Sequence, residues 1–425
     1  FKEIDKASRA LAAWLQAKGL KRGDRVAVMM PNIPQYPVAV RAVLRAGCVV
    51  VNVNPLLAGR ELELLLKDAG AQAIVVLESQ AATLQATLPR VPVHTIVIAA
   101  MGDMLGPIKR GLVNYLERAG RRTVPAYDLP AAVRFNDAVD QGQSLPLADQ
   151  RSSPEDLAVL QYTGGTTGPC KGVVLLHRNL VANVLQAQAW FHPALRQAGD
   201  SEQTRAVCVM PLHTIFGFSL GLLLGPLKGV CTILIANPRD LSGVIKELAD
   251  ERIHWLSATN TLFDALAQSA HSDNIYWSAL RLCLNTGTDL KASTATAWRK
   301  KSGHPIARCY GLSETSPFVA CAVPGAAEAR ERLGLPLPST QVEIIDADGC
   351  PLPPGATGEI AVRGPQVLAG YWQRPDETAR VMTAEGFLRT GDIGRMDENG
   401  ELHLLSRKRD TIKINGDDVF PNELE

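Results

Sequence analysis

The chain has 425 residues, of which 46% are hydrophobic and 20% are charged, and its formal net charge is +1. This length favours two or three compact units, and the composition is typical of a globular protein rather than a disordered or fibrous one. A charge near zero, without a long run of like charge, argues against a nucleic-acid-binding surface. The eight scattered cysteines include no CxxC pair, which argues against a zinc module or a disulfide framework and fits a reducing cytosol.

Nothing in the sequence predicts a membrane span, which needs roughly 20 consecutive apolar residues. The longest apolar run, residues 216–227, is interrupted by glycines and is expected to form a buried helix or strand. No signal peptide is recognisable, although the chain begins at Phe1 rather than at Met, so its absence carries little weight. We expect a cytoplasmic protein.

The first 80 residues alternate between helical and strand-like patterns, which is typical of a doubly wound α/β unit. The expected helices are residues 4–20, 36–46 and 61–69, and the expected strands are 25–30, 48–53 and 73–77. A second alternating series begins near residue 206. Its expected strands are 207–210, 231–235, 254–258 and 280–284, with helices at 241–250 and from 262.

From about residue 334 the pattern changes to short strands joined by tight turns. Strands are expected at 341–345, 358–362 and 401–405, with Asp348-Gly349 and Asn399-Gly400 as hairpin turns. The predicted fold class is therefore α/β, with two doubly wound subdomains and a small β-barrel-like subdomain. The predicted divisions are residues 1–205, 206–333, 334–405 and 406–425.

The most informative segment runs from Tyr162 to Gly172 with the sequence YTGGTTGPCKG, between expected strands at 157–160 and 173–176. Its glycines allow successive backbone N–H groups to turn inward and bind an anion, and three threonine hydroxyls add donors. Lys171 adds a charge that suits phosphate. The spacing does not fit GxxxxGK[ST], which disfavours a Walker-type NTPase. The alternative is a flexible surface loop.

The YTGGTTGxxKG pattern resembles the phosphate loop of the superfamily of acyl-CoA synthetases, firefly luciferase and peptide-synthetase adenylation domains. Residues 25–61, with MMPN, QYPVA and VNVNP, residues 161–183 and residues 237–240 resemble bacterial long-chain fatty acyl-CoA synthetases. The resemblance covers essentially the whole chain. It implies ATP, Mg²⁺ and coenzyme A as cofactor and co-substrates. In the loop it implies a catalytic Lys171 and Thr166, with Thr166 also near the metal, and nucleotide contacts from Thr163, Gly164, Gly165, Thr167 and Gly168.

A second motif, Tyr310 to Thr315 with the sequence YGLSET, resembles the family's YGxTE. The correspondence implies that Tyr310 stacks on adenine beside Gly311, Ser313 bonds the α-phosphate and Glu314 binds Mg²⁺. Ser313 replaces the usual Thr. Alone, a Ser-Glu turn would be read as a helix cap.

Three further matches follow downstream. In the TGD-like segment, the resemblance implies that Asp392 accepts both ribose hydroxyls, which suits a carboxylate with two acceptor oxygens. Arg407 matches a nucleotide-contacting arginine, and Arg409 stands at the hinge position, usually Asp or Lys. Without the resemblance, the segment around Asp392 would be interpreted as a turn before a strand, and the segment around Arg407 as a solvated basic turn. Tyr371 is predicted to serve packing. The chain ends at Glu425, where the family's next domain begins, and the family's catalytic lysine belongs to that domain.

The resemblance also implies an acyl-substrate site with His213, Thr259 and Asn260, and a nucleotide contact at Gly287. The pattern departs from the family here. Thr214 stands where the family places His, and His213 where it places Tyr; a core-facing His213 without a role is the alternative. Thr286 is bulkier than the expected Gly and is expected to crowd or redirect the base. Cys309 replaces a usual Gly.

The sequence thus predicts ATP-dependent activation of a fatty acid to an acyl-adenylate, followed by transfer to coenzyme A. The alternatives are an adenylating enzyme for an aryl or amino acid, and a catalytically degenerate nucleotide- or acyl-binding protein. Fatty acid and coenzyme A are the expected partners, with no nucleic acid. The oligomeric state is left open, with a homodimer as one option.

One segment outside these motifs suggests a membrane contact. Residues 107–122 place Ile108, Leu112 and Tyr115 at helical spacing among five basic residues, as in helices that lie on anionic lipid. Gly111 and Gly120 weaken such a helix. A solvated surface helix is the alternative to peripheral contact at the inner membrane.

Overall fold

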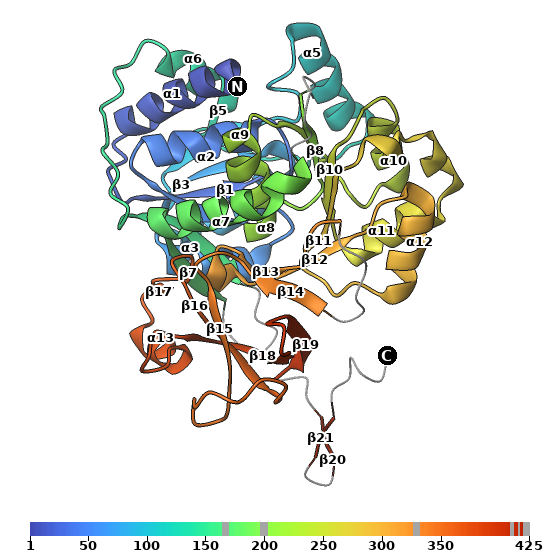
Figure 1. Ribbon diagram of the computed structural model, residues 1–425. Helices are drawn as coiled ribbons and strands as arrows, with labels where there is room; N and C mark the ends of the chain where they lie inside the picture. The colour runs from blue at the N-terminus through green and yellow to red at the C-terminus, as the bar shows by residue number, and fades with distance from the viewer. Residues whose placement is uncertain (164–169, 196–202, 326–331, 409–411, 415–416, 420–425) are drawn as a thin grey trace. The chain divides into compact units, whose positions relative to one another are not determined.

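The computed structural model describes residues 1–163, 170–195, 203–325, 332–408, 412–414 and 417–419. The chain divides into two compact units (Figure 1). Unit 1 comprises residues 1–177 and 211–214, and unit 2 comprises residues 178–210 and 215–425. The four-part division expected from the sequence stays a prediction.

Unit 1 is built on a mostly parallel sheet with the strand order β7-β6-β2-β1-β3-β4-β5, in which only the β6–β7 pair is antiparallel. Strands such as β2 are buried along their whole length, because both faces of a parallel sheet are covered. The strands are β1 (Arg25–Met29), β2 (Val49–Asn52), β3 (Ala71–Leu77), β4 (Thr95–Ala99), β5 (Val133–Arg134), β6 (Leu157–Thr163) and β7 (Lys171–Leu176).

Helices cover this sheet, and α1 packs against α2 and α6 (Figure 1). Trp14 of α1 is buried, and its indole N–H donates to Gln141 Oε1 over 3.0 Å, which satisfies its polar atom. The α-helices are α1 (Lys2–Ala17), α2 (Gln35–Arg45), α3 (Gly59–Ala69), α4 (Ala81–Thr87), α5 (Pro107–Tyr115) and α6 (Phe135–Gly142), and a π-helical turn, η3 (Leu116–Gly120), continues α5.

The first part of unit 2 is a parallel sheet with the order β9-β8-β10-β11-β12. Its core centres on Trp298, whose ring meets Phe263 and Trp277 edge-to-face at 4.9 Å each. The elements are α7 (His177–Leu195), β8 (Arg205–Cys208), α8 (Ile215–Gly217), η4 (Phe218–Leu224), α9 (Gly225–Leu227), β9 (Cys231–Leu234), α10 (Leu241–Ala249), β10 (Trp255–Ala258), α11 (Asn260–Gln268), β11 (Leu282–Asn285), α12 (Ala292–Ser302) and β12 (Ala307–Gly311).

The same sheet continues from β12 with antiparallel strands in the order β13-β14-β19-β18-β16-β15. The α/β class is confirmed, but in the described residues these strands extend an open sheet and do not close a barrel. The elements are β13 (Phe318–Cys321), β14 (Arg332–Pro336), β15 (Gln341–Ile345), β16 (Gly358–Arg363), β17 (Gly370–Tyr371), α13 (Pro375–Val381), β18 (Leu388–Met396) and β19 (Leu402–Arg407), with β20 (Ile412–Ile414) and β21 (Asp417–Val419) as a separate pair.

Candidate functional site

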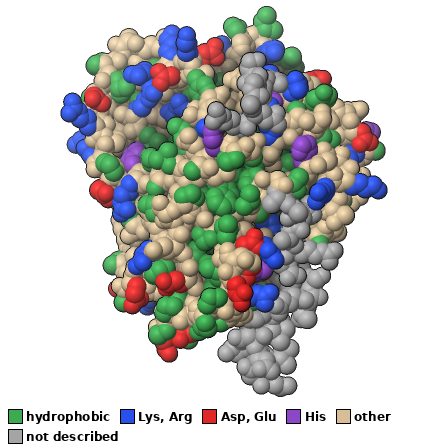
Figure 2. All heavy atoms as spheres, viewed as in Figure 1, with side chains coloured by type: hydrophobic (Ala, Val, Ile, Leu, Met, Phe, Trp, Pro, Cys, Tyr) green, Lys and Arg blue, Asp and Glu red, His purple; other side chains and the backbone are tan. Residues whose placement is uncertain are grey.

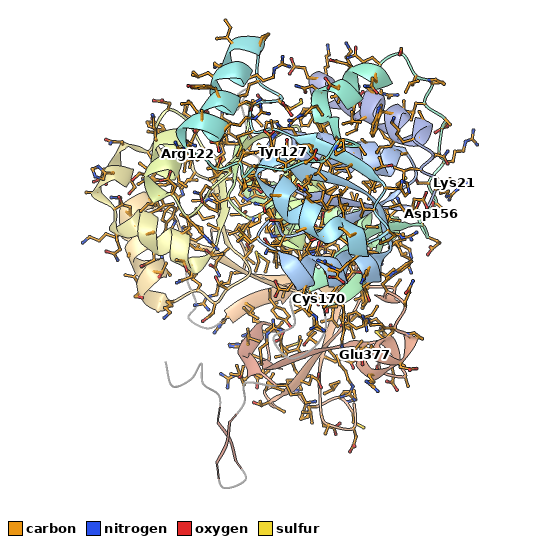
Figure 3. All side chains as sticks on the ribbon, turned by 180° about the vertical axis from the view of Figure 1, so that it is seen from behind. Lys21, Arg122, Tyr127, Asp156, Cys170 and Glu377 are labelled. Atoms are coloured by element: carbon orange, nitrogen blue, oxygen red, sulfur yellow. The ribbon has the colours of Figure 1, made fainter. Side chains whose placement is uncertain are left out.

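In unit 1 the glycine- and threonine-rich segment is the connection of the β6–β7 hairpin, in which Thr163 and Lys171 face each other across the pair. Tyr162, one residue before, donates from its hydroxyl to Asp68 Oδ2 over 2.7 Å and so holds this end of β6 to α3. Cys170 is exposed at the other end of the connection (Figure 3). The predicted site residues Gly164, Gly165, Thr166, Thr167 and Gly168 lie outside the described residues.

A chain of buried neutral groups, which we call the amide relay, runs from α2 across β2 to β6. It consists of Tyr36, Asn52 and Gln161, each at most 5% exposed. The Tyr36 hydroxyl donates to Asn52 Oδ1 over 2.9 Å, Asn52 Nδ2 donates to Gln161 Oε1 over 2.9 Å, and Gln161 Nε2 donates to the His213 carbonyl over 2.9 Å. The relay therefore links the strand that leads to Thr163 with the backbone at His213.

His213 belongs to a short turn that a second amide also fixes, since Leu212 N–H donates to Asn32 Oδ1 over 2.8 Å. Burial lowers the pKa of His213 to about 4, so its imidazole is neutral near pH 7. Its Nδ1 is buried and has no hydrogen-bond partner within the described part of the chain. Sequence reasoning did not assign a role to Asn32, Asn52 or Gln161, although each is a polar residue within or next to an apolar segment.

In unit 2 three predicted nucleotide residues meet in what we call the charged cluster, formed by Tyr310, Asp392 and Arg407 with Glu314 and Tyr371. Asp392 on β18 is 1% exposed and accepts a hydrogen bond from the Tyr310 hydroxyl over 2.7 Å. Arg407 on β19 stands opposite Asp392 in the strand register and pairs with it over 3.1 Å. Burial and the Asp392 charge raise the pKa of the Tyr310 phenol well above its usual value, so the phenol remains a donor.

Glu314 lies in a 3₁₀ turn, η7 (Ser313–Thr315), directly after β12. Tyr371 donates from its hydroxyl to Glu314 Oε1 over 2.9 Å, and the Glu314 carbonyl accepts from Leu368 N–H over 2.8 Å. Burial raises the pKa of the Glu314 carboxyl. The expectation that Tyr371 serves packing was therefore incomplete, because its hydroxyl orients the predicted metal ligand.

The turn that carries Ser313 depends on the glycine before it. A Cβ on Gly311 would lie 1.9 Å from the Pro317 carbonyl oxygen, so no larger residue fits in this conformation. Thr315 closes the turn by accepting from Leu312 N–H over 3.0 Å and donating to the Pro317 carbonyl over 2.5 Å. Ser313 itself is partly exposed in this turn.

The loop after β11 contains Gly287 and is tied to the start of α11. Asn260 N–H donates to Thr288 Oγ1 over 3.1 Å, and Asn260 Oδ1 accepts from Lys291 N–H over 2.9 Å. Asn260 thus has a structural task in addition to the predicted substrate role, and Thr259 is the residue that precedes α11. Thr286 is fully buried, and the expectation that it crowds or redirects the base stays a prediction.

A buried carboxylate that the sequence did not single out lies under the segment before the predicted hinge. Glu359, 7% exposed, pairs with Lys408 over 3.0 Å and with Arg389 over 3.3 Å, and it accepts from Gly391 N–H over 3.1 Å. Lys408 also donates from its backbone to the Gly391 carbonyl over 2.9 Å. The predicted hinge residue Arg409 lies outside the described residues.

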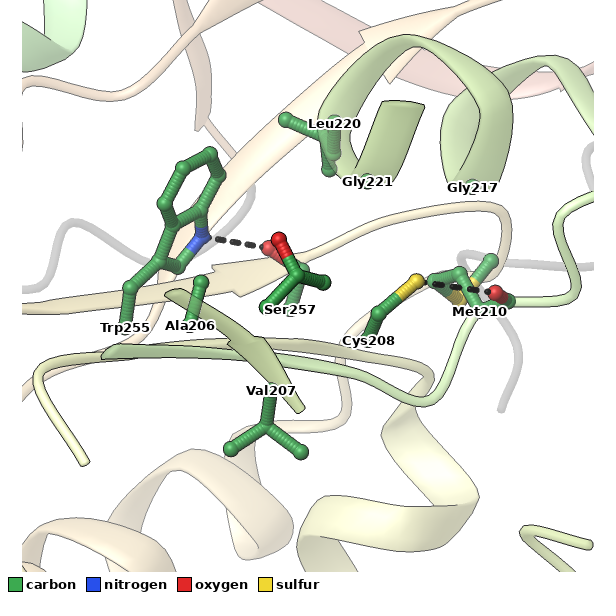
Figure 4. Close-up of a pocket in the computed structure, with 10 residues that line it drawn as sticks. Ala206, Val207, Cys208, Met210, Gly217, Leu220, Gly221, Trp255 and Ser257 are labelled. Carbon is green, nitrogen blue, oxygen red and sulfur yellow. Dashed lines mark hydrogen bonds between the residues drawn. The ribbon is translucent and has the colours of Figure 1, made fainter. Parts of the chain in front are cut away.

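A narrow apolar cavity of unit 2 contains about 280 Å³ of empty space, its open mouth included (Figure 4). The Trp255 indole donates to Ser257 Oγ over 2.6 Å at its wall. Thr259 and Asn260 do not line it. The lining residues are Ala206, Val207, Cys208, Met210, Gly217, Leu220, Gly221, Thr232, Trp255 and Ser257.

The described helices include none that is both long and apolar enough to cross a membrane. Within the described ranges, no three His, Cys, Asp or Glu side chains lie close enough together to form a metal site from protein ligands alone. Glu314 fits a divalent cation in one respect: burial disfavours its charged form, and a bound cation offsets that cost.

Comparison with known proteins gives one consistent result. Residues 1–372 match the family described as AMP-binding enzyme. The chain is 42% identical over 426 residues to a long-chain-fatty-acid–CoA ligase of Escherichia coli O6:H1, with all of this chain and 75% of that protein covered. The corresponding ligase of Haemophilus influenzae is also 42% identical, with the same coverage. A crystal structure of the anthranilate CoA ligase AuaEII in complex with anthranoyl-AMP matches all of this chain and 76% of its own, with a TM-score of 0.84 at 22% identity, which supports the fold alone.

Proposed function

Because the chain belongs to the family of AMP-binding enzymes, we propose that it activates a fatty acid with ATP and transfers the acyl group to coenzyme A. The observation that carries this proposal is the 42% identity over the whole chain to long-chain-fatty-acid–CoA ligases. The chain spans three quarters of the length of those proteins.

The adenosine part of ATP is assigned to the charged cluster of unit 2. Tyr310 is assigned to the adenine ring, Gly287 and Gly311 are assigned nucleotide contacts, and Asp392 is assigned to the ribose hydroxyls. Asp392 already receives hydrogen bonds from the Tyr310 hydroxyl and the Arg407 guanidinium, so its carboxylate is oriented before nucleotide binds. This arrangement reduces the reorganisation needed on binding.

In unit 1, the hairpin connection is assigned to phosphate binding. In unit 2, η7 carries the residues assigned to phosphate and to the metal. Lys171 and Thr163 stand at the base of that connection, and the residues from Gly164 to Gly168 complete it, with Thr166 as donor and as second metal contact. Ser313 bonds the α-phosphate. Glu314 would hold Mg²⁺, which would neutralise phosphate charge when bound. Arg409 is assigned to the hinge.

The reaction proceeds in two displacements. A fatty-acid carboxylate oxygen attacks the α-phosphorus of ATP, the bond to the bridging oxygen breaks, and pyrophosphate leaves. The thiolate sulfur of coenzyme A then attacks the acyl carbon of the adenylate, and AMP leaves. Neither step needs a protein nucleophile, so the task of these residues is to position the groups and stabilise charge.

The acyl chain is assigned to the apolar cavity of unit 2 beside Trp255 (Figure 4), and Thr259 and Asn260 of that unit are assigned to substrate binding. His213 of unit 1, whose imidazole is neutral, is likewise assigned to the substrate. A neutral imidazole can donate one hydrogen bond to a carboxylate without a competing desolvated charge. The cavity is narrow, so a long chain requires the side chains at its wall to move.

The test is pyrophosphate release by the full-length protein with acids of graded length, together with benzoate-type acids and amino acids. We expect turnover with fatty acids and thioester formation with coenzyme A. A preference for an aryl or amino acid would overturn the substrate class. Nucleotide binding without pyrophosphate release would instead identify a degenerate binding protein.

We also propose that α5 and η3 form a peripheral contact with anionic lipid. Ile108, Leu112 and Tyr115 are 88%, 58% and 66% exposed, and no residue of α5 is buried. Figure 2 shows apolar and basic side chains side by side at the end of unit 1 that carries this helix. Arg118 pairs with the buried Glu78 and Arg121 with Glu117, so Lys109 and Arg110 are the cations assigned to lipid.

Flotation with phosphatidylglycerol vesicles tests this contact. We expect the wild-type protein to float with anionic but not with phosphatidylcholine vesicles, and the double variant Ile108→Ser/Leu112→Ser to stay in the lower fraction. Leu64→Ser, at an exposed apolar residue of α3, is the matched control and should float as the wild type does. Equal flotation by the double variant and the wild type would overturn the proposal.

A further inference from the structure

Two buried cysteines, Cys309 on β12 and Cys321 on β13, face each other beside the charged cluster. They are 8% and 0% exposed, they are direct partners in the antiparallel register, and their Sγ atoms are 2.7 Å apart. The neighbouring pair carries the hydrogen bond from Ala322 N–H to the Arg308 carbonyl, over 2.9 Å. Cys309 and Cys321 therefore form a non-hydrogen-bonded pair, the position at which opposing Cα atoms are about 4.5 Å apart.

This position is compatible with a covalent link, because bridged cysteines have Cα atoms roughly 4.4–6.8 Å apart. Both cysteines are free thiols. The next residue along each strand matters as well, since Tyr310 faces Ala320 and donates its hydroxyl to Asp392. A bond at this point would tie the two strands together immediately before the tyrosine.

We propose that Cys309 and Cys321 form an oxidisable dithiol, a modification site that closes to a cross-strand disulfide when the protein meets a hydroperoxide. Closure fixes the backbone of β12 next to Tyr310 and changes the affinity for nucleotide. The modification itself is independent of the proposed function, whereas its effect on nucleotide affinity rests on that function.

The chemistry balances with the peroxide as oxidant. The Cys309 thiolate attacks a peroxide oxygen, the O–O bond breaks, and an alcohol leaves after taking a proton, so that Cys309 becomes a sulfenic acid. Cys321 sulfur then attacks Cys309 sulfur, and the sulfenic oxygen leaves as water with the Cys321 proton. Two thiols are oxidised while one peroxide is reduced to alcohol and water.

The order of the two cysteines follows from their surroundings. Cys321 is completely buried, and burial raises the pKa of its thiol well above the usual value. Cys309 retains a small exposed surface, which gives the peroxide access. We therefore assign the first step to Cys309 and the resolving step to Cys321.

The first experiment is peptide mapping of the full-length wild-type protein after treatment with tert-butyl hydroperoxide and alkylation of remaining thiols. We expect a linked Cys309–Cys321 peptide that dithiothreitol separates. The buried Cys208 and Cys283, which lie on strands separated by β10, should remain alkylated singly and serve as internal controls. Recovery of Cys309 and Cys321 as separate alkylated thiols, under conditions that oxidise the exposed Cys170 and Cys350, would overturn the proposal.

The second experiment measures ATP affinity by calorimetry before oxidation, after oxidation and after reduction. We expect a change of about threefold or more that reduction reverses, that is absent in Cys309→Ser and that persists in Cys283→Ser. A disulfide that forms without any change in affinity would overturn the coupling to Tyr310. No ATP binding by the reduced wild-type protein would count against the proposed function, not against the modification site.

Discussion

The amide relay of unit 1 and the charged cluster of unit 2 compensate the cost of burying polar side chains in two different ways. Both bury polar side chains beside a predicted ligand-binding segment and satisfy them with hydrogen bonds. The relay uses neutral groups from Tyr36 to Gln161, whereas the cluster buries Asp392 and partly buries Glu314. Neutral groups cost little to bury once they are bonded, while a carboxylate must be compensated by a cation or by strong donors.

From this difference we expect the stability of the amide relay in unit 1 to be independent of pH over the moderate range. The stability of the charged cluster in unit 2 should depend on pH and on bound cations. Asp392 has a cationic partner in Arg407, but Glu314 has a neutral one in Tyr371, which is why burial raises its pKa. If Glu314 binds a metal, the charged cluster is less stable without that metal, because the buried carboxylate then lacks a cationic partner.

The strongest way to break the charged cluster is Asp392→Ala. It removes the buried partner of Tyr310 and Arg407, and we expect ATP–pyrophosphate exchange to fall about 100-fold or more, since breaking a buried charged pair costs about 3–5 kcal/mol. Asp392→Asn keeps an acceptor for Tyr310 and should retain more activity. Thermal melting separates loss of exchange from loss of fold, and full exchange by the folded Ala variant would refute the assignment.

Lys171→Ala tests the hairpin connection that the relay leads to. A charge-assisted contact to phosphate is worth about 1.5–3 kcal/mol, so ATP binding or the adenylation rate should fall about tenfold or more. Lys67→Ala, at an exposed lysine of α3, is the control and should behave as wild type. Unchanged affinity and unchanged rate would remove Lys171 from the site.

Gln161→Leu breaks the relay at its centre. The Asn52 amide and the His213 carbonyl then lose their partners, and we expect the free energy of unfolding to fall by about 1–3 kcal/mol in urea titrations. The loss should be the same between about pH 5 and 8, since Gln161, Asn52 and Tyr36 do not titrate there. A loss that varies with pH over this range would show that His213 is coupled to the relay.

The smallest expected effect is that of Glu314→Gln on the pH dependence of the unfolding free energy. The folded pKa of Glu314 is raised above the unfolded value, so above about pH 4.5 the folded state binds more protons and its stability falls as pH rises. The variant removes this fall, and the difference in unfolding free energy between wild type and variant should shift with pH between about 4 and 7. Glu398→Gln, at an exposed position, should not shift it. Added Mg²⁺ should stabilise wild type more than Glu314→Gln.

The local pattern of apolar and polar residues was enough to predict most of the secondary structure. The predicted strand at residues 341–345 has the bounds of β15. The expected strand at 25–30 is one residue longer than β1 at one end, and the expected strand at 48–53 is one residue longer than β2 at each end. Residues 216–227 could not be assigned because their apolar residues lack a period, and their middle part is the π-helix η4. The antiparallel strands β13, β14 and β18 were missed, since β13 has only four residues and glycines interrupt β14 and β18.

The site was predictable where a motif placed its residues next to one another and not where distant strands meet. Tyr310, Asp392 and Arg407 came from three separate motifs, and the structure brings these three together. Glu359, Tyr371 and Gln161 were not assigned to the site, because their partners lie far away in the sequence. Thr286 is buried, and its expected effect on the base stays a prediction.

The turn between β18 and β19 gives the protein an uneven tolerance to change. Asp397 closes it, accepting from the backbone N–H groups of Asn399 and Glu401 over 2.9 and 3.0 Å, and thereby sets which residues of the two strands stand opposite each other. Replacing Glu398 by another polar residue leaves that alignment intact. Deleting one residue from the turn shifts it by one position and turns Arg407 to the other face of the sheet, away from Asp392. Variation in length at this exposed turn is therefore far more damaging than variation in residue type.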